Sequence, residues 1–197
     1  MKTIFVTYAV KEEFIPLEIE GCNVVHIYTG VGKTKSAHVL TKKLCLLKPD
    51  LVLNIGTAGS LQHNIGDVFI ANLFVDRDYE AIKLPGINYE INGLQLLNSI
   101  PELKGKVLEY EKTGVCSTGD TFVTNPITVY GDIIEMEAFA QAYVCKEFDV
   151  AFLSIKYITD IIGENSVELW ESKLDDARKK LLLWFKENNI LSIFASQ

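Results

Sequence analysis

The feature that most constrains the fold is a strand–helix–strand pattern between Asp132 and Asp160. An apolar strand-like run leads into an amphipathic helical pattern, and a second apolar run ends at Thr159 and Asp160. Parallel strands need a crossover connection, commonly a helix, so this pattern predicts a β-α-β unit. Ligands of parallel α/β sheets bind at the carboxyl ends of the strands, which is where this unit carries its acids.

Two carboxylates, Glu135 and Glu137, straddle Met136 at the junction between the first strand and the helix. Together with Asp160 they could form the acidic wall of an active site. An ordinary structural interpretation also fits, because the helix dipole stabilises acids at a helix N-terminus and an aspartate can cap the next helix. The spacing of these acids leaves both interpretations open.

Strand-like and helix-like segments alternate along the rest of the chain. Strands are expected at residues 3–9, 23–28, 51–55, 68–74 and 106–116, and helices at 34–48, 94–98 and 166–189. A turn is expected at residues 56–59, where Gly-Thr-Ala-Gly follows an apolar run. The last helix carries a regular apolar stripe that includes Trp170. This alternation predicts an α/β fold, a three-layer sandwich around a central mixed, mostly parallel sheet.

Length and composition favour one domain over residues 1–197. The chain is 48% hydrophobic, and no Pro-, Ser- or Gly-rich linker divides it. The net charge is −7 and the basic residues form no stripe interleaved with aromatics, which disfavours a nucleic-acid partner. No apolar run reaches the roughly 20 residues that span a bilayer, and no basic, cleavable leader is recognisable. We therefore expect no membrane association and a cytoplasmic location.

The cysteines and histidines show no metal-ligand spacing. Each of the four cysteines lies in an apolar run, which predicts buried free thiols: Cys22, Cys45, Cys116 and Cys145. Three histidines, His26, His38 and His63, form no cluster with them. We therefore expect no metal site and ordinary structural histidines.

The turn Gly30-Val31-Gly32-Lys33-Thr34 resembles the end of a phosphate-binding P-loop. The motif requires a further glycine where this chain has Ile27, so a nucleoside triphosphatase is rejected. What remains is a glycine-flanked turn before a helix. Such a turn either brings backbone N–H groups to an oxygen-rich ligand or serves only as a tight turn.

Two other segments follow predicted strands. Residues 9–13 (Ala-Val-Lys-Glu-Glu) end the first strand with paired acids, which a helix N-terminus would also favour. Residues 117–123 combine hydroxyls, a carboxylate and Phe122, which suits a pocket for a flat heterocycle, or else a turn that returns Phe122 to the core.

Taken together and in this order, these segments resemble the methylthioadenosine/S-adenosylhomocysteine nucleosidases of the purine nucleoside phosphorylase superfamily. The matching motifs are A-V-K-E-E, T-G-V-G-K, N-I-G-T-A-G-S-L followed by G-D-V, S-T-G-D-T-F-V, E-M-E-A and K-Y-I-T-D, from Ala9 to Asp160. The specific part is E-M-E followed, one helix and one strand later, by a strand-terminal aspartate. The resemblance implies a nucleoside phosphorylase-like fold.

The resemblance also implies two catalytic residues. Asp160 matches the general acid that protonates N7 of the leaving adenine, and Glu13 matches the acid that activates the attacking water. The chemistry agrees, because cleavage passes through an oxocarbenium-like sugar that nearby carboxylates stabilise. The apolar strand before Asp160 makes burial plausible, which would help this acid to keep its proton.

The resemblance assigns further residues to the substrate. Glu137 and Met136 match residues that hold the ribose, Phe122 matches a ring that stacks on the purine, and the Val123 backbone would pair with the adenine edge. The remaining expected substrate-binding residues are Thr29, which stands where the family has a serine, Ala9 and Gly59.

The chain departs from the family pattern in three places. The stretch between Glu13 and Thr29 is short, Lys156 stands where arginine is common, and residues 161–168 diverge in a region that closes over the 5′ substituent. Phosphorylases usually clamp phosphate with arginine, but this chain has only Arg77 and Arg178, neither in a glycine-rich turn. Hydrolysis is therefore favoured, although Lys33 or a second subunit could supply charge.

The sequence thus predicts a nucleosidase for 5′-modified adenosines such as methylthioadenosine or S-adenosylhomocysteine, without metal or cofactor, acting as a homodimer. The alternatives are a futalosine-type nucleosidase, a purine nucleoside phosphorylase and a non-catalytic nucleoside-binding protein. Retention of Glu13, Glu137 and Asp160 argues against the last, because binding alone needs no proton donor at the leaving base.

Overall fold

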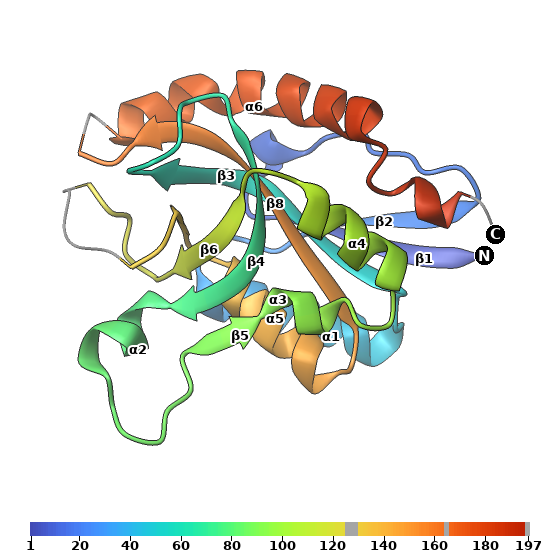
Figure 1. Ribbon diagram of the computed structural model, residues 1–197, viewed down its shortest axis with the longest axis horizontal. Coiled ribbons are helices and arrows are strands. Elements are labelled where there is room, and N and C mark those ends of the chain that lie inside the picture. Colours follow the sequence, from blue (N-terminus) through green and yellow to red (C-terminus); the bar gives the residue numbers. More distant parts are fainter. Residues whose placement is uncertain (125–129, 164–165, 196–197) are drawn as a thin grey trace.

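The described part of the chain forms an eight-stranded sheet with helices on both faces (Figure 1). The computed structural model describes residues 1–124, 130–163 and 166–195. The strands are β1 (Lys2–Tyr8), β2 (Cys22–Tyr28), β3 (Leu51–Ser60), β4 (Val68–Asp76), β5 (Glu90–Asn92), β6 (Thr113–Thr118), β7 (Ile133–Glu135) and β8 (Ala151–Ile161). The helices are α1 (Lys33–Leu46), α2 (Arg77–Ile82), α3 (Gly93–Leu96), α4 (Pro101–Glu109), α5 (Ala138–Glu147) and α6 (Ser166–Asn188), with short 3-10 turns η1 (Lys11–Glu13) and η2 (Ser192–Phe194).

The sheet is mixed and mostly parallel, as predicted. β2, β1, β3 and β8 pair in parallel, and so do β4, β6 and β7. Antiparallel pairing of β8 with β4 and of β7 with β3 joins the two sets, and β5 pairs antiparallel with β4. Because β7 pairs antiparallel with the last two residues of β3, this short strand lies beside the carboxyl ends of β3 and β8.

Alternating side chains of the central strands fill two cores, one on each face. In β3, Leu51 and Leu53 face the core that α4 and α6 cover, whereas Val52 faces the core beneath α1 and α5. β8 divides in the same way, with Leu153 in the first core and Phe152 in the second. This period of two is what a strand buried on both faces requires. The layers confirm the predicted three-layer α/β sandwich (Figure 1).

The strand predicted at residues 106–116 is wrong in its first half. Helix α4 occupies Pro101–Glu109, and strand β6 starts only at Thr113. Pro101 stands at the first helical turn, where its missing N–H costs nothing, and Leu103 and Val107 lie four residues apart and are fully buried. Tertiary packing of this one helical face explains the difference.

The turn predicted at residues 56–59 is also wrong, because β3 continues through to Ser60. This part of β3 pairs with β8, and a bulge lies between Ala58 and Gly59. A Cβ atom on Gly59 would lie 2.8 Å from Oδ2 of Asp160. The glycine therefore serves the close approach of two strands rather than a turn.

The cysteine prediction holds in part. All four thiols are free, and Cys116 and Cys145 are buried, but Cys22 is half-buried and Cys45 is exposed. Cys45 lies on α1, where the buried side chains Leu40 and Leu44 define the inward face. The apolar run around Cys45 therefore continues onto the outward face of the helix.

The short stretch after Glu13 closes one side of the molecule. Ile15 and Leu17 are buried in the core beneath α6, so this segment packs without a helix of its own. Among the residues described, no helix is both long and apolar enough to cross a membrane.

Candidate active site

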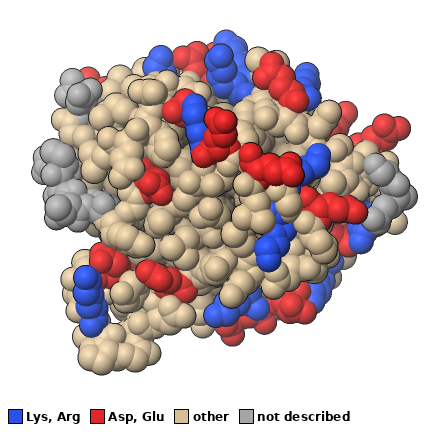
Figure 2. All heavy atoms as spheres, in the orientation of Figure 1, with Lys and Arg blue, Asp and Glu red and all other residues tan. Residues whose placement is uncertain are grey.

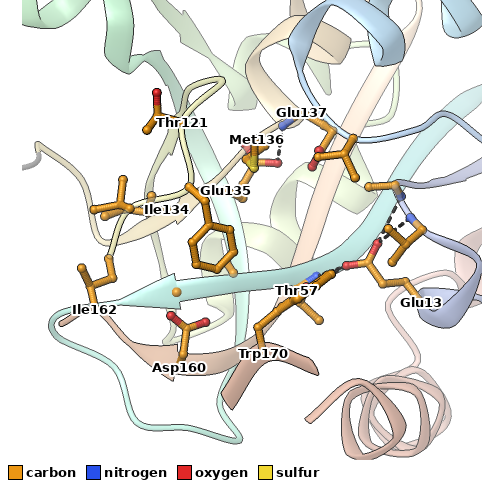
Figure 3. A pocket seen from close by; sticks show the side chains of 17 residues that line it. Glu13, Thr57, Thr121, Ile134, Glu135, Met136, Glu137, Asp160, Ile162 and Trp170 are labelled. Carbon is orange, nitrogen blue, oxygen red and sulfur yellow. Dashed lines mark hydrogen bonds between the residues drawn. The ribbon is translucent and has the colours of Figure 1, made fainter. Parts of the chain in front are cut away.

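A cavity of about 330 Å³ opens beside β7 and the carboxyl ends of β3 and β8 (Figure 3). Both predicted catalytic acids, Asp160 and Glu13, line it. The structure brings almost all the predicted substrate-binding residues to the same cavity: Glu137, Met136, Phe122, Val123, Ala9 and Gly59. These residues come from segments far apart in the sequence, which the topology of the sheet gathers at one edge.

Thr29 is the predicted site residue that does not line this cavity. It is buried where β2 gives way to the glycine turn, and its hydroxyl lies 3.2 Å from the Tyr8 carbonyl and 3.3 Å from the Gly30 carbonyl, both acceptors. The side chain therefore stabilises the turn from behind rather than facing the cavity.

Glu13 is held by four donors. Its Oε1 accepts hydrogen bonds from the backbone N–H and the hydroxyl of Thr57, at 2.9 and 2.7 Å. Its Oε2 accepts from the N–H groups of Ala9 and Val10, at 3.1 and 3.3 Å. The 3-10 turn η1 places this carboxylate at the end of β1, so the acid is buried but fixed in orientation (Figure 3).

Glu135 lies in a buried ion pair with Lys156. The ammonium Nζ is 3.1 Å from Glu135 Oε2, and both side chains are almost fully buried. The Thr118 hydroxyl and the backbone N–H groups of Glu137 and Ala138 also donate to this carboxylate. Burial opposes ionisation, but the lysine charge and these hydrogen bonds hold the pKa of Glu135 below its ordinary value.

Glu137 stands at the N-terminus of α5, and its Oε1 accepts a hydrogen bond from Gly32 N–H at 2.8 Å. Burial and the nearby charge of Glu135 raise the pKa of Glu137 to about 8. The pKa of Glu135 is thus lowered and that of Glu137 is raised. Perturbed pKa values of this kind are common among acids of active sites. The charges of Glu135, Glu137 and Glu13 outweigh burial and raise the pKa of Lys156.

Asp160 projects from the end of β8 and is only 3% exposed. The Thr159 hydroxyl donates to its Oδ1 at 2.8 Å. Figure 3 shows Asp160 and Glu137 on opposite sides of the cavity, reached from different elements. Asp160 is therefore a buried residue of strand β8 itself.

Several residues of the wall escaped the prediction, among them Thr57 and Trp170. Thr57 lies within the segment that was expected to be a turn, and Trp170 was counted in the apolar stripe of the last helix. Trp170 instead reaches the cavity, where its ring lies 6.3 Å from that of Phe122, at 65°, and its Nε1–H donates to the Thr57 hydroxyl at 2.9 Å. No local signal separates it from the core, because Trp184 on the same helix has the same polar indole edge and is a core residue.

The glycine turn before α1 binds carboxylates of the protein. Its Gly32 N–H holds Glu137, and the next N–H, of Lys33, donates to Asp120 Oδ1 at 2.7 Å. The Lys33 ammonium pairs with Asp76 and Asp78. The Lys33 ammonium is therefore engaged in ion pairs within the protein.

Arg77 supports the loop that carries Phe122. The guanidinium donates to the carbonyls of Ser117 and Thr121, at 3.2 and 2.8 Å. A Cβ atom on Gly119 would lie 2.6 Å from this group, so the loop passes directly over it. Arg178, by contrast, is exposed on α6 and pairs with Asp175.

The described lining of the cavity contains no lysine or arginine. Nor does the part of the chain that the structure describes contain a group of three or more His, Cys, Asp or Glu side chains arranged to hold a metal ion. The chemistry on offer is therefore that of carboxylates, backbone N–H groups and aromatic rings around a mostly apolar cavity.

Comparisons with known proteins agree with this geometry. The family model described as the phosphorylase superfamily matches residues 5–183. The 5′-methylthioadenosine/S-adenosylhomocysteine nucleosidase of Geobacillus sp. (strain WCH70) is 33% identical over 186 residues, which cover 85% of this chain and 80% of that protein. The chain belongs to the methylthioadenosine/S-adenosylhomocysteine nucleosidase family. The member of this family from Bacillus subtilis (strain 168) is also 33% identical, over 84% of this chain and 80% of its own length.

Solved structures show that this nucleosidase family member has the expected fold. A futalosine hydrolase mutant of Helicobacter pylori strain 26695 superposes with a TM-score of 0.80 at 22% identity, covering 96% of this chain and 99% of that one. The Helicobacter pylori 5′-methylthioadenosine/S-adenosylhomocysteine nucleosidase with butyl-thio-DADMe-Immucillin-A gives a TM-score of 0.80 at 23% identity, covering 96% and 98%. These likenesses confirm a nucleoside phosphorylase-like fold.

Proposed function

We propose that this protein hydrolyses the N-glycosidic bond of 5′-modified adenosines, methylthioadenosine and S-adenosylhomocysteine, and releases adenine. The observation that carries the proposal is the meeting of three buried acids, Asp160, Glu13 and Glu137, in one largely apolar cavity. Each comes from a different element, as separate roles at the base, the water and the sugar require. The nucleosidase names of the relatives support the same reaction.

In this mechanism Asp160 gives its proton to N7 of adenine, so that the base leaves neutral. Asp160 is buried at the end of an apolar strand and lines the cavity. Proton transfer of this kind is typically worth about 10² to 10⁴ in rate. The Phe122 ring and the Val123 backbone, which line the cavity, would hold the flat base in position for the transfer.

Glu13 activates the attacking water and Glu137 holds the ribose hydroxyls. The longer hydrogen bonds to Glu13 end on Oε2, at 3.1 and 3.3 Å, which makes this oxygen the one to accept from a water. A hydroxyl that donates to Glu137 favours its ionised form, and the positive charge that develops on the sugar favours it further. Met136 lies between the two glutamates of the motif and packs against the sugar.

Water is the proposed nucleophile rather than phosphate. Cationic side chains commonly bind a phosphate dianion, and the described wall of the cavity contains neither lysine nor arginine. Lys33, Arg77 and Arg178 are all engaged with other residues of the protein.

The test is to incubate the purified protein with methylthioadenosine, with and without phosphate, and to identify the sugar product. We expect free methylthioribose to be formed without phosphate. Its rate of formation should fall by a factor of about 10² to 10⁴ in Asp160→Asn. Asp149→Asn is a matched control, because Asp149 is exposed and its φ of +51° suits asparagine equally well. A phosphorylated sugar would show phosphorolysis, and turnover of futalosine alone would reassign the substrate.

We also propose that the enzyme is a cytoplasmic homodimer, as the family resemblance implies. An apolar rim beside the cavity supports a subunit contact there: Val31, which lines the cavity, is 39% exposed and Tyr28 is 48% exposed. Light scattering of the purified protein should give twice the mass of the chain. A monomeric mass at micromolar concentration would contradict the dimer.

A further inference from the structure

Trp170 connects the wall of the cavity to the carboxylate of Glu13. Its indole Nε1–H donates to the Thr57 hydroxyl oxygen at 2.9 Å. The same hydroxyl donates to Glu13 Oε1 at 2.7 Å, and the Thr57 backbone N–H reaches that oxygen at 2.9 Å. An indole, a hydroxyl and a carboxylate therefore stand in a continuous row, of which Figure 3 shows the part between Thr57 and Glu13.

The direction of the hydrogen bonds in this row is fixed by chemistry. An indole N–H can only donate, and an ionised carboxylate can only accept. The hydroxyl of Thr57 must therefore accept from Trp170, and its single proton is turned toward Glu13. Hydrogen bonds in such a chain polarise one another, so each bond strengthens the next.

We propose that Trp170 is a positioning residue, which acts through the Thr57 hydroxyl to hold Glu13 in the orientation that activates water. This inference rests on the proposed function, because it gives Glu13 that role. The indole is itself held in place, because its backbone belongs to α6 and its ring packs against that of Phe122. Loss of its N–H leaves the hydroxyl free to rotate while the aromatic wall stays filled.

The chain contains a matched control for this substitution. Its other tryptophan, Trp184, also lies on α6, and its Nε1–H also donates to a hydroxyl, that of Tyr110, at 2.9 Å. Trp184 packs in the core and does not line the cavity. Replacement of either tryptophan by phenylalanine removes one indole hydrogen bond, but only one of the two bonds leads to an acid of the site.

The kinetic test is a double-mutant cycle with methylthioadenosine as substrate. Trp170→Phe should lower kcat by about threefold to tenfold with little change in KM, the effect of one neutral hydrogen bond. Thr57→Val should lower kcat by about 10- to 100-fold, because its hydroxyl bonds to a charged group. In the Thr57→Val background the Trp170→Phe change should have no further effect, and Trp184→Phe should leave kcat unchanged.

A structural readout does not depend on turnover. In ¹⁵N-labelled protein the two indole N–H signals are assigned with the two phenylalanine variants. Thr57→Val and Glu13→Gln should both move the Trp170 signal and leave that of Trp184 in place.

Any one of three results would overturn the proposal. These are an unchanged kcat in Trp170→Phe, an equal fall in kcat from Trp170→Phe with Thr57 and with Thr57→Val, and a Trp170 signal that does not move in Glu13→Gln. If the Trp170 signal moves as expected in the variants but the wild-type protein shows no turnover, hydrolysis is refuted. The connection from Trp170 to Glu13 is then still supported.

Discussion

Glu137 should make the folded protein less stable as pH rises, and its replacement by glutamine should remove this loss of stability. Its pKa is raised from 4.5 to about 8 in the folded state. Between these values the folded protein binds a proton that the unfolded chain releases, so stability falls with increasing pH. At about 1.4 kcal/mol per pKa unit, the loss between pH 4.5 and pH 7 is about 3 kcal/mol.

Glutamine keeps the shape of Glu137 and can still accept from Gly32 N–H, but it carries no charge. We therefore expect the free energy of unfolding of Glu137→Gln, measured in urea, to equal that of the wild type near pH 4.5 and to be about 3 kcal/mol higher at pH 7. The gain should accompany a loss of activity, as is common where a site stores unfavourable charge.

Two matched substitutions test the reasoning. Glu135→Gln should act in the opposite direction, because the pKa of Glu135 is lowered and its charge is paired with Lys156. Glu12→Gln, at an exposed neighbour of Glu13, should change little. A stability difference between Glu137→Gln and the wild type that is equal at pH 4.5 and pH 7 would refute the argument.

Three further outcomes are expected. Gly59→Ala should lower the free energy of unfolding by about 1 to 3 kcal/mol and reduce kcat, because the new methyl group displaces Asp160. Gly105→Ala, in open space within α4, should raise the free energy of unfolding by about 0.5 to 1 kcal/mol. Equal effects of the two substitutions in urea unfolding would contradict the close packing of the strands at Gly59. Lys156→Met should destabilise by about 3 to 5 kcal/mol, since it leaves a buried carboxylate unpaired, and a neutral result in thermal unfolding would count against the ion pair. Arg77→Lys should raise KM more than it lowers kcat, because a lysine cannot hold both carbonyls of the loop, and an unchanged KM would refute that role.

The sequence predicted those parts of the site that depend on local pattern. E-M-E at the start of a helix and an aspartate at the end of an apolar strand were both recognised in the strand–helix–strand pattern, and the structure brings Glu137 and Asp160 to one cavity. The parallel arrangement expected for this unit is wrong, because β7 runs antiparallel to β3 whereas β8 runs parallel to it. The predicted layers and the mixed sheet were right, since they follow from the order of strands and helices.

The features that were missed depend on pairing across the sheet. Gly59 looked like a turn residue, but partner β8 extends β3 through it. Thr29 looked like a ligand residue, but the end of β1 supplies a carbonyl acceptor for its hydroxyl. Trp170 fits a helical stripe perfectly well, and only the approach of β3 gives its N–H a partner in Thr57.

The turn before α1 joins the sugar side of the cavity to the base side. Adjacent N–H groups of Gly32 and Lys33 hold Glu137, beside the proposed ribose site, and Asp120, two residues before Phe122. Because these two N–H groups belong to adjacent residues, a shift of the turn displaces the hydrogen-bond donors of both carboxylates together.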